Sequence, residues 1–257
     1  VKVHKIYCTP NGEFPHNPEP LEEHLSDLSN EVTAQRADLG IAVDPDVDRL
    51  VFIDENGLFF GEEYTLVACA DYILKTEKGP IVSNLSSSRA LADLANDYDV
   101  NYHASAIGEL HVVSKMKEVK ALIGGEGNGG VILPTLHYGR DALVGIALFL
   151  SHIANEKIRV SKLKERYTSY VMYKKKIELS CSWNLDALLD TVATSFVDAR
   201  VTTIDGVKID FDDSWIHLRK SNTEPIIRLY AEAKSQDKIK AKIEKVEATI
   251  AEFIASV

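Results

Sequence analysis

Apolar positions in the first two thirds of the chain alternate between short continuous runs and runs with helical spacing. Apolar runs predict short buried strands at 39–43, 50–53 and 121–124. We also expect short strands at 1–7, 80–85 and 100–103. Apolar residues three and four positions apart predict helices at 21–36, 62–75, 89–97, 109–117 and 142–153. Strands that alternate with helices predict mixed, mostly parallel α/β domains. Asn56-Gly57 is a hairpin signal, which predicts that residues 58–60 pair back.

The pattern changes near Lys176. Short strands are predicted between residues 177 and 232, and amphipathic helices at 185–197 and 237–254. This indicates a small α+β domain in which two helices lie on a four-stranded antiparallel sheet. The expected division is therefore 1–57, 58–157, a charged linker at 158–172, and a C-terminal domain at 173–257.

Composition narrows the class of protein. The 257 residues are 45% hydrophobic, which is enough for two or more packed domains, and the net charge of −10 argues against a nucleic-acid partner. Three scattered cysteines predict a reducing compartment without a disulfide or zinc framework. No apolar run reaches membrane-spanning length, so we expect a cytoplasmic protein without a membrane partner. The chain begins at Val1 rather than Met, which suggests a piece of a longer protein.

Three aspartates stand at alternate positions directly after a predicted buried strand: Asp44, Asp46 and Asp48. In extended backbone, alternate side chains point to the same side, so their carboxylates are expected to converge. Three converging negative charges require a cation, and ligands made only of oxygen select a hard ion such as Mg²⁺. Arg49 adds a fixed positive charge that suits a phosphate group.

Other interpretations of the same residues remain open. Glu55 falls at the twelfth position from Asp44, as in an EF-hand loop, but Arg49 occupies the sixth position, where that loop needs glycine. A Mg²⁺-dependent aspartyl-phosphate phosphatase would use Asp44 as nucleophile and Asp46 as acid. A solvated acidic turn is the plainest alternative.

A glycine-rich loop follows the predicted strand at 121–124. Residues 125–130 read GEGNGG, so backbone can approach a ligand closely, and Glu126 and Asn128 are the only side chains available. A carboxylate and an amide suit a pair of sugar hydroxyls. A flexible turn is the alternative, but ligands bind at the carboxyl ends of strands in α/β sheets, which favours a binding loop.

A second loop, between the last two predicted strands, is dense in hydrogen-bond donors. It spans residues 219–228, and the candidate phosphate-binding residues are Arg219, Ser221, Asn222, Thr223 and Arg228. Guanidinium groups, hydroxyls and backbone N–H groups together suit a dianionic phosphate. The alternative is a polar hairpin loop that ends at Pro225.

These three motifs, in this order, resemble the α-D-phosphohexomutase family of phosphoglucomutase, phosphomannomutase and phosphoglucosamine mutase. Its metal loop resembles DGDGDR, with Pro45 and Val47 here in place of glycines. Its sugar loop resembles GEMSGH, with Asn128 and Gly130 here in place of serine and histidine. Its phosphate loop resembles RxSxTEPxxR, matched by Arg219, Ser221, Thr223, Glu224, Pro225 and Arg228.

The resemblance implies a four-domain enzyme of which this chain supplies the later part. It implies transfer of a phosphoryl group between positions 1 and 6 of a hexose or hexosamine phosphate, through an enzyme phosphoserine and a bisphosphate. It also implies that Asp44, Asp46 and Asp48 hold Mg²⁺, that Arg49 acts at the transferring group, and that the missing N-terminal domains are partners. The phosphoserine motif resembles TASHNP and is absent from this sequence, since Ser86–Ser88 lack the following His-Asn. A sugar-phosphate-binding module without turnover is the alternative of a different class.

Overall fold

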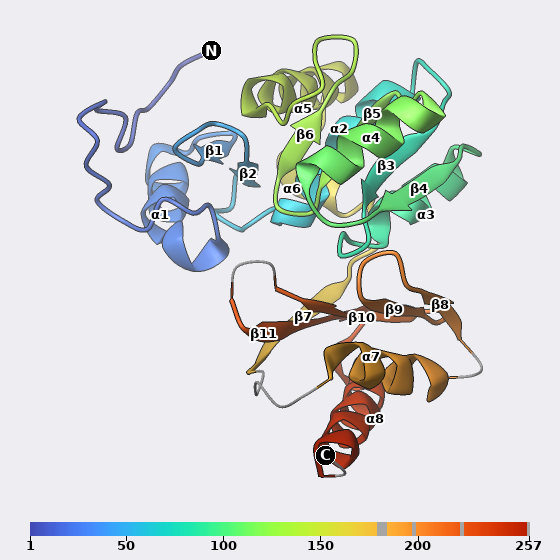
Figure 1. The fold of residues 1–257 in the computed structure, drawn as a ribbon. Helices are drawn as coiled ribbons and strands as arrows, with labels where there is room; N and C mark the ends of the chain where they lie inside the picture. The colour runs from blue at the N-terminus through green and yellow to red at the C-terminus, as the bar shows by residue number, and fades with distance from the viewer. Residues whose placement is uncertain (179–183, 197–198, 222–223, 256–257) are drawn as a thin grey trace.

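The computed structural model describes residues 1–178, 184–196, 199–221 and 224–255. Three parts follow one another along the chain: an N-terminal part, an α/β body and a C-terminal sheet with helices on one face (Figure 1).

The N-terminal part is small and rests on one hairpin. It contains a 3-10 turn η1 (Glu22–His24), helix α1 (Ser26–Gln35) and the antiparallel strands β1 (Gly40–Val43) and β2 (Leu50–Ile53). Residues 1–20 are all described and none lies in a strand, so the strand predicted over 1–7 is wrong. An isolated strand leaves its backbone groups without partners, and β1 and β2 pair with each other instead.

The α/β body is built on a four-stranded sheet of order β4-β3-β5-β6. Its strands are β3 (Ile81–Asn84), β4 (Tyr102–Ser105), β5 (Ile123–Glu126) and β6 (Gly130–Ile132). Its helices are α2 (Glu62–Leu74), α3 (Ala90–Asp97), α4 (Glu109–Val119), α5 (Ala142–Glu156) and α6 (Val160–Lys164). Strands β4, β3 and β5 are parallel and β6 is antiparallel, which confirms the predicted mixed, mostly parallel α/β fold.

The two faces of this sheet bury different clusters. Val82 and Ile132 pack with Val112 and Met116 of α4, whereas Ile81 and neighbouring strand residues pack with α2, α3 and α5. Strand β2 joins this body to the N-terminal part, because Leu50 and Phe52 enter the body's core while Val51 and Ile53 pack on α1. The hairpin return predicted at 58–60 is reduced to one bridge, between Ile53 and Phe59.

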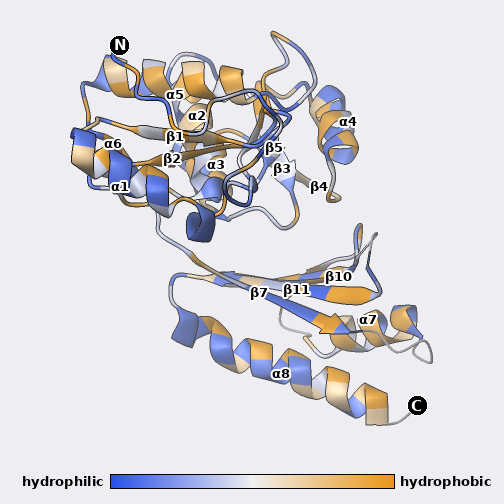
Figure 2. Ribbon diagram, turned by 90° about the vertical axis from the view of Figure 1, so that its left-hand side faces the viewer, coloured by the Kyte–Doolittle hydropathy of each residue, from blue (hydrophilic) through white to orange (hydrophobic). Residues whose placement is uncertain are grey.

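The C-terminal part is an antiparallel sheet of order β7-β11-β10-β9-β8. Its elements are β7 (Val171–Glu178), β8 (Arg200–Thr202), β9 (Val207–Asp210), β10 (Ser214–Lys220), β11 (Ile226–Ala233), α7 (Leu185–Thr194) and α8 (Gln236–Ala255). The predicted α+β arrangement is confirmed, but the described residues form a sheet of five strands rather than four, in which β8 pairs with β9. Helices α7 and α8 lie on the same face (Figures 1 and 2), and the apolar residues of α8 are buried against the sheet.

The other face of this sheet is turned toward the α/β body (Figure 1). Alternate side chains of a strand point to opposite faces. Ile216 and Leu218 of β10 lie in the core under the helices, so Trp215, His217 and Arg219 face the body.

The segment 158–172, predicted to be a linker, is packed against the body. Val160 and Leu163 of α6 are buried in the body's core. The hydroxyl of Tyr167 donates to Asp71 at 2.9 Å, and that of Tyr170 donates to Asp93 at 2.5 Å. The covalent connection to the C-terminal sheet is therefore held in place by side-chain contacts up to the start of β7.

Candidate functional site

The acidic loop between β1 and β2 is a tight turn rather than extended backbone. The N–H of Val47 donates to the carbonyl oxygen of Asp44 at 3.1 Å, and Val47 adopts a positive φ of 59°. Oδ1 of Asp44 accepts the backbone N–H groups of Asp48 and Arg49, each at 3.0 Å. The predicted extended geometry is therefore wrong, although the turn still gathers the side chains.

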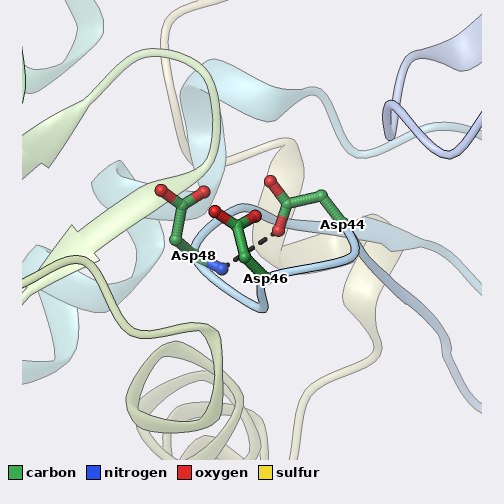
Figure 3. A group of neighbouring side chains, drawn as sticks. All are labelled: Asp44, Asp46 and Asp48. Carbon is green, nitrogen blue, oxygen red and sulfur yellow. Dashed lines mark hydrogen bonds between the residues drawn. The ribbon is translucent and has the colours of Figure 1, made fainter.

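The three aspartates offer carboxylate oxygens that lie within 4.8 Å of one another, all on one side of the loop (Figure 3). Asp44 is buried, Asp46 is exposed and Asp48 is half-buried. Burial, together with the neighbouring Asp44 carboxylate, raises the pKa of Asp48 to about 6, although Arg140 opposes the shift. Burial acts in the same direction on Asp44, but hydrogen bonds from the backbone of Arg49 and its other donors outweigh it and lower the pKa.

This donor set fits a hard divalent cation. Oδ1 of Asp48 is buried and has no hydrogen-bond partner among the described residues. Buried polar atoms normally have a partner, and a bound cation would provide one here. An oxygen-only site of this kind suits Mg²⁺, which also keeps coordination positions for water or phosphate oxygens.

Arg49 lies beside the acidic cluster. Its Nε is 3.5 Å from Oδ2 of Asp44 and 3.8 Å from Oδ1 of Asp48, and its Nη1 donates to Glu19 at 3.1 Å. The guanidinium group thus borders the place where a cation and an anionic ligand would meet.

The glycine-rich loop connects β5 to β6 and lies against the start of β2. The N–H of Leu50 donates to the carbonyl oxygen of Gly129 at 3.1 Å. Gly129 has a φ of +91°, and a Cβ there would lie 2.4 Å from the carbonyl oxygen of Leu50, so only glycine fits. The predicted sugar loop and the predicted metal loop are therefore neighbours in space.

Glu126 is buried, and most of the hydrogen-bond acceptor positions of its carboxylate are occupied. Oε1 accepts the side-chain amide of Asn84 at 2.9 Å and the N–H of Gly108 at 3.1 Å, while Oε2 accepts Nη1 of Arg140 at 3.0 Å. Each oxygen has two lone-pair sites, so Oε2 keeps room for about one more donor, such as a hydroxyl. Oδ1 of Asn128 accepts the N–H of Gly130 at 3.2 Å and shapes the loop from within.

Arg140 joins these two loops, a role that no local pattern in the sequence predicts. Its guanidinium donates to Asp48 of the acidic loop and Glu126 of the glycine-rich loop, and its Nε donates to Glu109 at 3.2 Å. Only folding brings these carboxylates, far apart in sequence, to one cation.

In the C-terminal loop, Arg219 of β10 pairs directly with Arg228 of β11, so both side chains leave the sheet on the face turned toward the body. The Nε atoms of both are buried without a hydrogen-bond partner among the described residues. Nη2 of Arg228 donates to Glu224 at 2.8 Å and lies 3.5 Å from Oγ of Ser221. Asn222 and Thr223 lie outside the described residues.

The serine run has a second use that the sequence reading missed. Oγ of Ser88 accepts the N–H of Ala90, the first residue of α3, at 3.2 Å. The same segment, residues 84–89, is also where the C-terminal sheet meets the body. The contacts include Lys208 Nζ to the Leu85 carbonyl oxygen (2.7 Å), Ser86 Oγ to His217 Nδ1 (2.8 Å) and Arg89 Nη2 to the Phe211 carbonyl oxygen (2.7 Å).

Comparison with protein families identifies the chain. Models of phosphoglucomutase/phosphomannomutase match along it: alpha/beta/alpha domain II at residues 1–57, alpha/beta/alpha domain III at 61–170 and the C-terminal domain at 175–249. The chain belongs to the α-D-phosphohexomutase family. The predicted resemblance is thereby confirmed.

Relatives and solved structures agree. A phosphoglucomutase/phosphomannomutase of Thermococcus kodakarensis is 37% identical over 95% of this chain and 54% of its own, and a probable phosphoglucosamine mutase of Methanopyrus kandleri is 34% identical over 92% and 53%. A crystal structure of a family protein from Burkholderia thailandensis superposes with a TM-score of 0.78 at 26% identity, covering 91% of this chain and 52% of the other. An Aspergillus fumigatus N-acetylphosphoglucosamine mutase, at 15% identity and a TM-score of 0.59 over 82% of this chain and 48% of its own, shares the fold.

The chain thus spans about half the length of the curated relatives it matches. Within its described residues, no helix combines the length and the apolar character needed to cross a membrane.

Proposed function

We propose that this chain supplies the metal, sugar and phosphate loops of a phosphohexose mutase. The enzyme would move a phosphoryl group between positions 1 and 6 of a hexose or hexosamine phosphate, by way of a phosphoserine and a bisphosphate intermediate. That serine would lie outside these 257 residues, in the N-terminal domains that we propose as the chain's partners, because the sequence holds no TASHNP-like motif.

One observation carries the proposal: the contacts of Arg140 hold the metal loop and the sugar loop together. Arg140 donates hydrogen bonds to both Asp48 and Glu126. The backbone hydrogen bond from Leu50 to Gly129 connects the same two loops. Arg219 and Arg228 leave the C-terminal sheet on the face that looks toward this body. We infer that the three loops border a common region, which would suit a ligand with a phosphate at one end and a reacting group at the other.

The residues can be given separate roles. Asp44, Asp46 and Asp48 would hold Mg²⁺, which when bound would neutralise charge on the transferring phosphoryl group. Arg49 would lie against the equatorial oxygens of that group. Glu126, through its remaining lone pair, and Asn128 would orient ring hydroxyls.

The loop at 219–228 would hold the phosphate that does not react. Its residues Arg219, Ser221, Asn222, Thr223 and Arg228 would provide forked, charge-assisted donors. Holding the far end of the substrate contributes binding energy to orientation at the reacting end.

Names of relatives narrow the substrate class. Those of Thermococcus kodakarensis and Methanopyrus kandleri are named for glucose, mannose and glucosamine phosphates, and the Aspergillus fumigatus protein was solved with GlcNAc-6P and magnesium. We infer a hexose or hexosamine phosphate for this chain, with Mg²⁺ as its cofactor.

The phosphatase alternative is less well supported. A nucleophilic Asp44 would need a free, accessible oxygen, yet the residue is only 7% exposed and its Oδ1 already accepts two backbone N–H groups. A sugar-phosphate-binding module without turnover needs the same loops and differs only in the absence of the serine.

Calorimetry with glucose 6-phosphate and Mg²⁺ tests the phosphate loop. Arg219→Ala and Arg228→Ala should each weaken binding by about ten- to hundredfold, since each removes a charge-assisted partner. Arg200→Ala is the matched control, because that arginine is exposed on β8 and pairs with Asp210 outside the loop. Equal weakening by all three variants, or unchanged binding in the loop variants, would contradict the assignment.

A further inference from the structure

Arg140 is held by three carboxylates that come from different segments. Its Nη2 donates to Oδ2 of Asp48, its Nη1 donates to Oε2 of Glu126 at 3.0 Å, and its Nε donates to Oε2 of Glu109 at 3.2 Å. Its side chain is only 15% exposed. A planar guanidinium with fixed partners on three sides has little freedom to turn away.

This arrangement gives the two oxygens of Asp48 different tasks. Oδ2 accepts the hydrogen bond of Arg140, whereas Oδ1 is buried with no hydrogen-bond partner in the described part of the chain. The two oxygens of Asp44 also differ, because Oδ1 accepts the backbone N–H groups of Asp48 and Arg49. Two of the three clustered carboxylates therefore offer a cation one oxygen each.

The number of oxygens per carboxylate separates Mg²⁺ from Ca²⁺. Mg²⁺ requires near-octahedral coordination and is satisfied by single oxygens and water, whereas Ca²⁺ takes six to eight ligands and often binds a carboxylate through both oxygens. On the metal site of the proposed function, we propose that Arg140 sets the preference for Mg²⁺ over Ca²⁺ by occupying Oδ2 of Asp48. The residue acts through Asp48 and is a positioning residue.

A simple charge effect would act differently. Any cationic side chain near the cluster weakens the binding of both dications, because like charges repel. Arg49 provides the matched comparison, since it carries the same charge 3.5 Å from Asp44 and 3.8 Å from Asp48, and its Nε hydrogen-bonds neither carboxylate. Removing the charge of Arg49 should change both affinities together, whereas removing Arg140 should also change their ratio.

The test is titration calorimetry of the full chain with Mg²⁺ alone and with Ca²⁺ alone, for wild type, Arg140→Gln, Arg140→Lys and Arg49→Gln. We expect wild type to favour Mg²⁺, and Arg140→Gln to shift the ratio of the two dissociation constants toward Ca²⁺ by on the order of tenfold. Arg140→Lys should shift it as well, because lysine keeps the charge but not the fork. Arg49→Gln should leave the ratio unchanged.

An unchanged ratio in Arg140→Gln, with Mg²⁺ still binding, would overturn the inference and leave the metal site intact. If neither ion binds to wild type, both this inference and the proposed metal site are wrong. If the Arg140 variants do not fold, as judged by circular dichroism, infrared spectra of the carboxylate stretches in wild type decide. Carboxylates that bind both ions through a single oxygen would support the inference. A carboxylate that binds Ca²⁺ through both oxygens, with a signal that disappears in Asp48→Asn, would contradict it.

Discussion

Oε2 of Glu232 on β11 accepts the backbone N–H of Arg89 at 2.8 Å, immediately before helix α3. The neighbouring N–H of Ser88 donates to Oε2 of Glu63 at 2.7 Å. Two carboxylates, one from the C-terminal sheet and one from the body, thus hold adjacent N–H groups at one helix N-terminus, where negative charge is favourable. The C-terminal sheet is anchored to the same segment, 84–89, that supports the sugar loop through Asn84.

Glu232→Ala should therefore loosen the junction between the C-terminal sheet and the body. The change leaves the N–H groups of Arg89 and the Trp215 indole without their acceptor, at a cost of about 1.5–3 kcal/mol. Hydrogen exchange of residues 84–89 should accelerate. Glu244→Ala, on the exposed side of α8, is the control and should change nothing; equal exchange in both variants would show that Glu232 does not anchor the sheet.

Gly127→Ala should disturb the sugar loop. A Cβ at this position would lie 2.0 Å from Oε2 of Glu63, so either the loop or the carboxylate must move, at a cost of about 1–3 kcal/mol. Chemical denaturation of Gly127→Ala, Glu63→Ala and the double variant checks this. The double variant should lose less stability than the sum of the single ones, and strict additivity would refute the contact.

His217 predicts acid sensitivity. Burial lowers the pKa of this imidazole from 6.5 to about 4, with Nε2–H donating to the Asp205 carbonyl oxygen at 2.7 Å. As pH falls, the unfolded state therefore binds a proton near pH 6.5, whereas the folded state does so only near pH 4. The free energy of unfolding should thus decrease by roughly 3 kcal/mol between pH 6.5 and about pH 4. Urea unfolding of wild type and His217→Gln across this window measures the difference. The variant should show the flatter profile, and parallel profiles would contradict the assignment.

Asp46→Asn tests the metal loop. Asp46 is exposed and belongs to the acidic cluster, so the loss of its carboxylate charge should weaken Mg²⁺ binding roughly tenfold. Calorimetry with Mg²⁺ measures this, and Asp38→Asn, an exposed aspartate outside the cluster, should bind as wild type does. If both variants match wild type, Asp46 is not a ligand.

Sequence reasoning identified the elements that local pattern determines. The helices and the parallel strands of the body follow from hydrophobic spacing, and the acidic cluster was visible as Asp44, Asp46 and Asp48. The turn that gathers these carboxylates depends on Val47 in a left-handed conformation, which a strand-like reading of DPDVDR does not suggest. The contacts of Arg140 and Glu232 join residues far apart in sequence, so they arise from tertiary packing and leave no local pattern to read.

We propose that one sugar phosphate contacts all three loops, at 44–49, 125–130 and 219–228. The most direct measurement is a titration of the isotope-labelled full chain with glucose 6-phosphate in the presence of Mg²⁺, followed by NMR chemical-shift mapping, with unphosphorylated glucose as the reference. We expect the backbone signals of all three loops to shift with one common dissociation constant, and Arg228→Ala to weaken the response of all three together. Shifts confined to a single loop, or three unrelated dissociation constants, would contradict it.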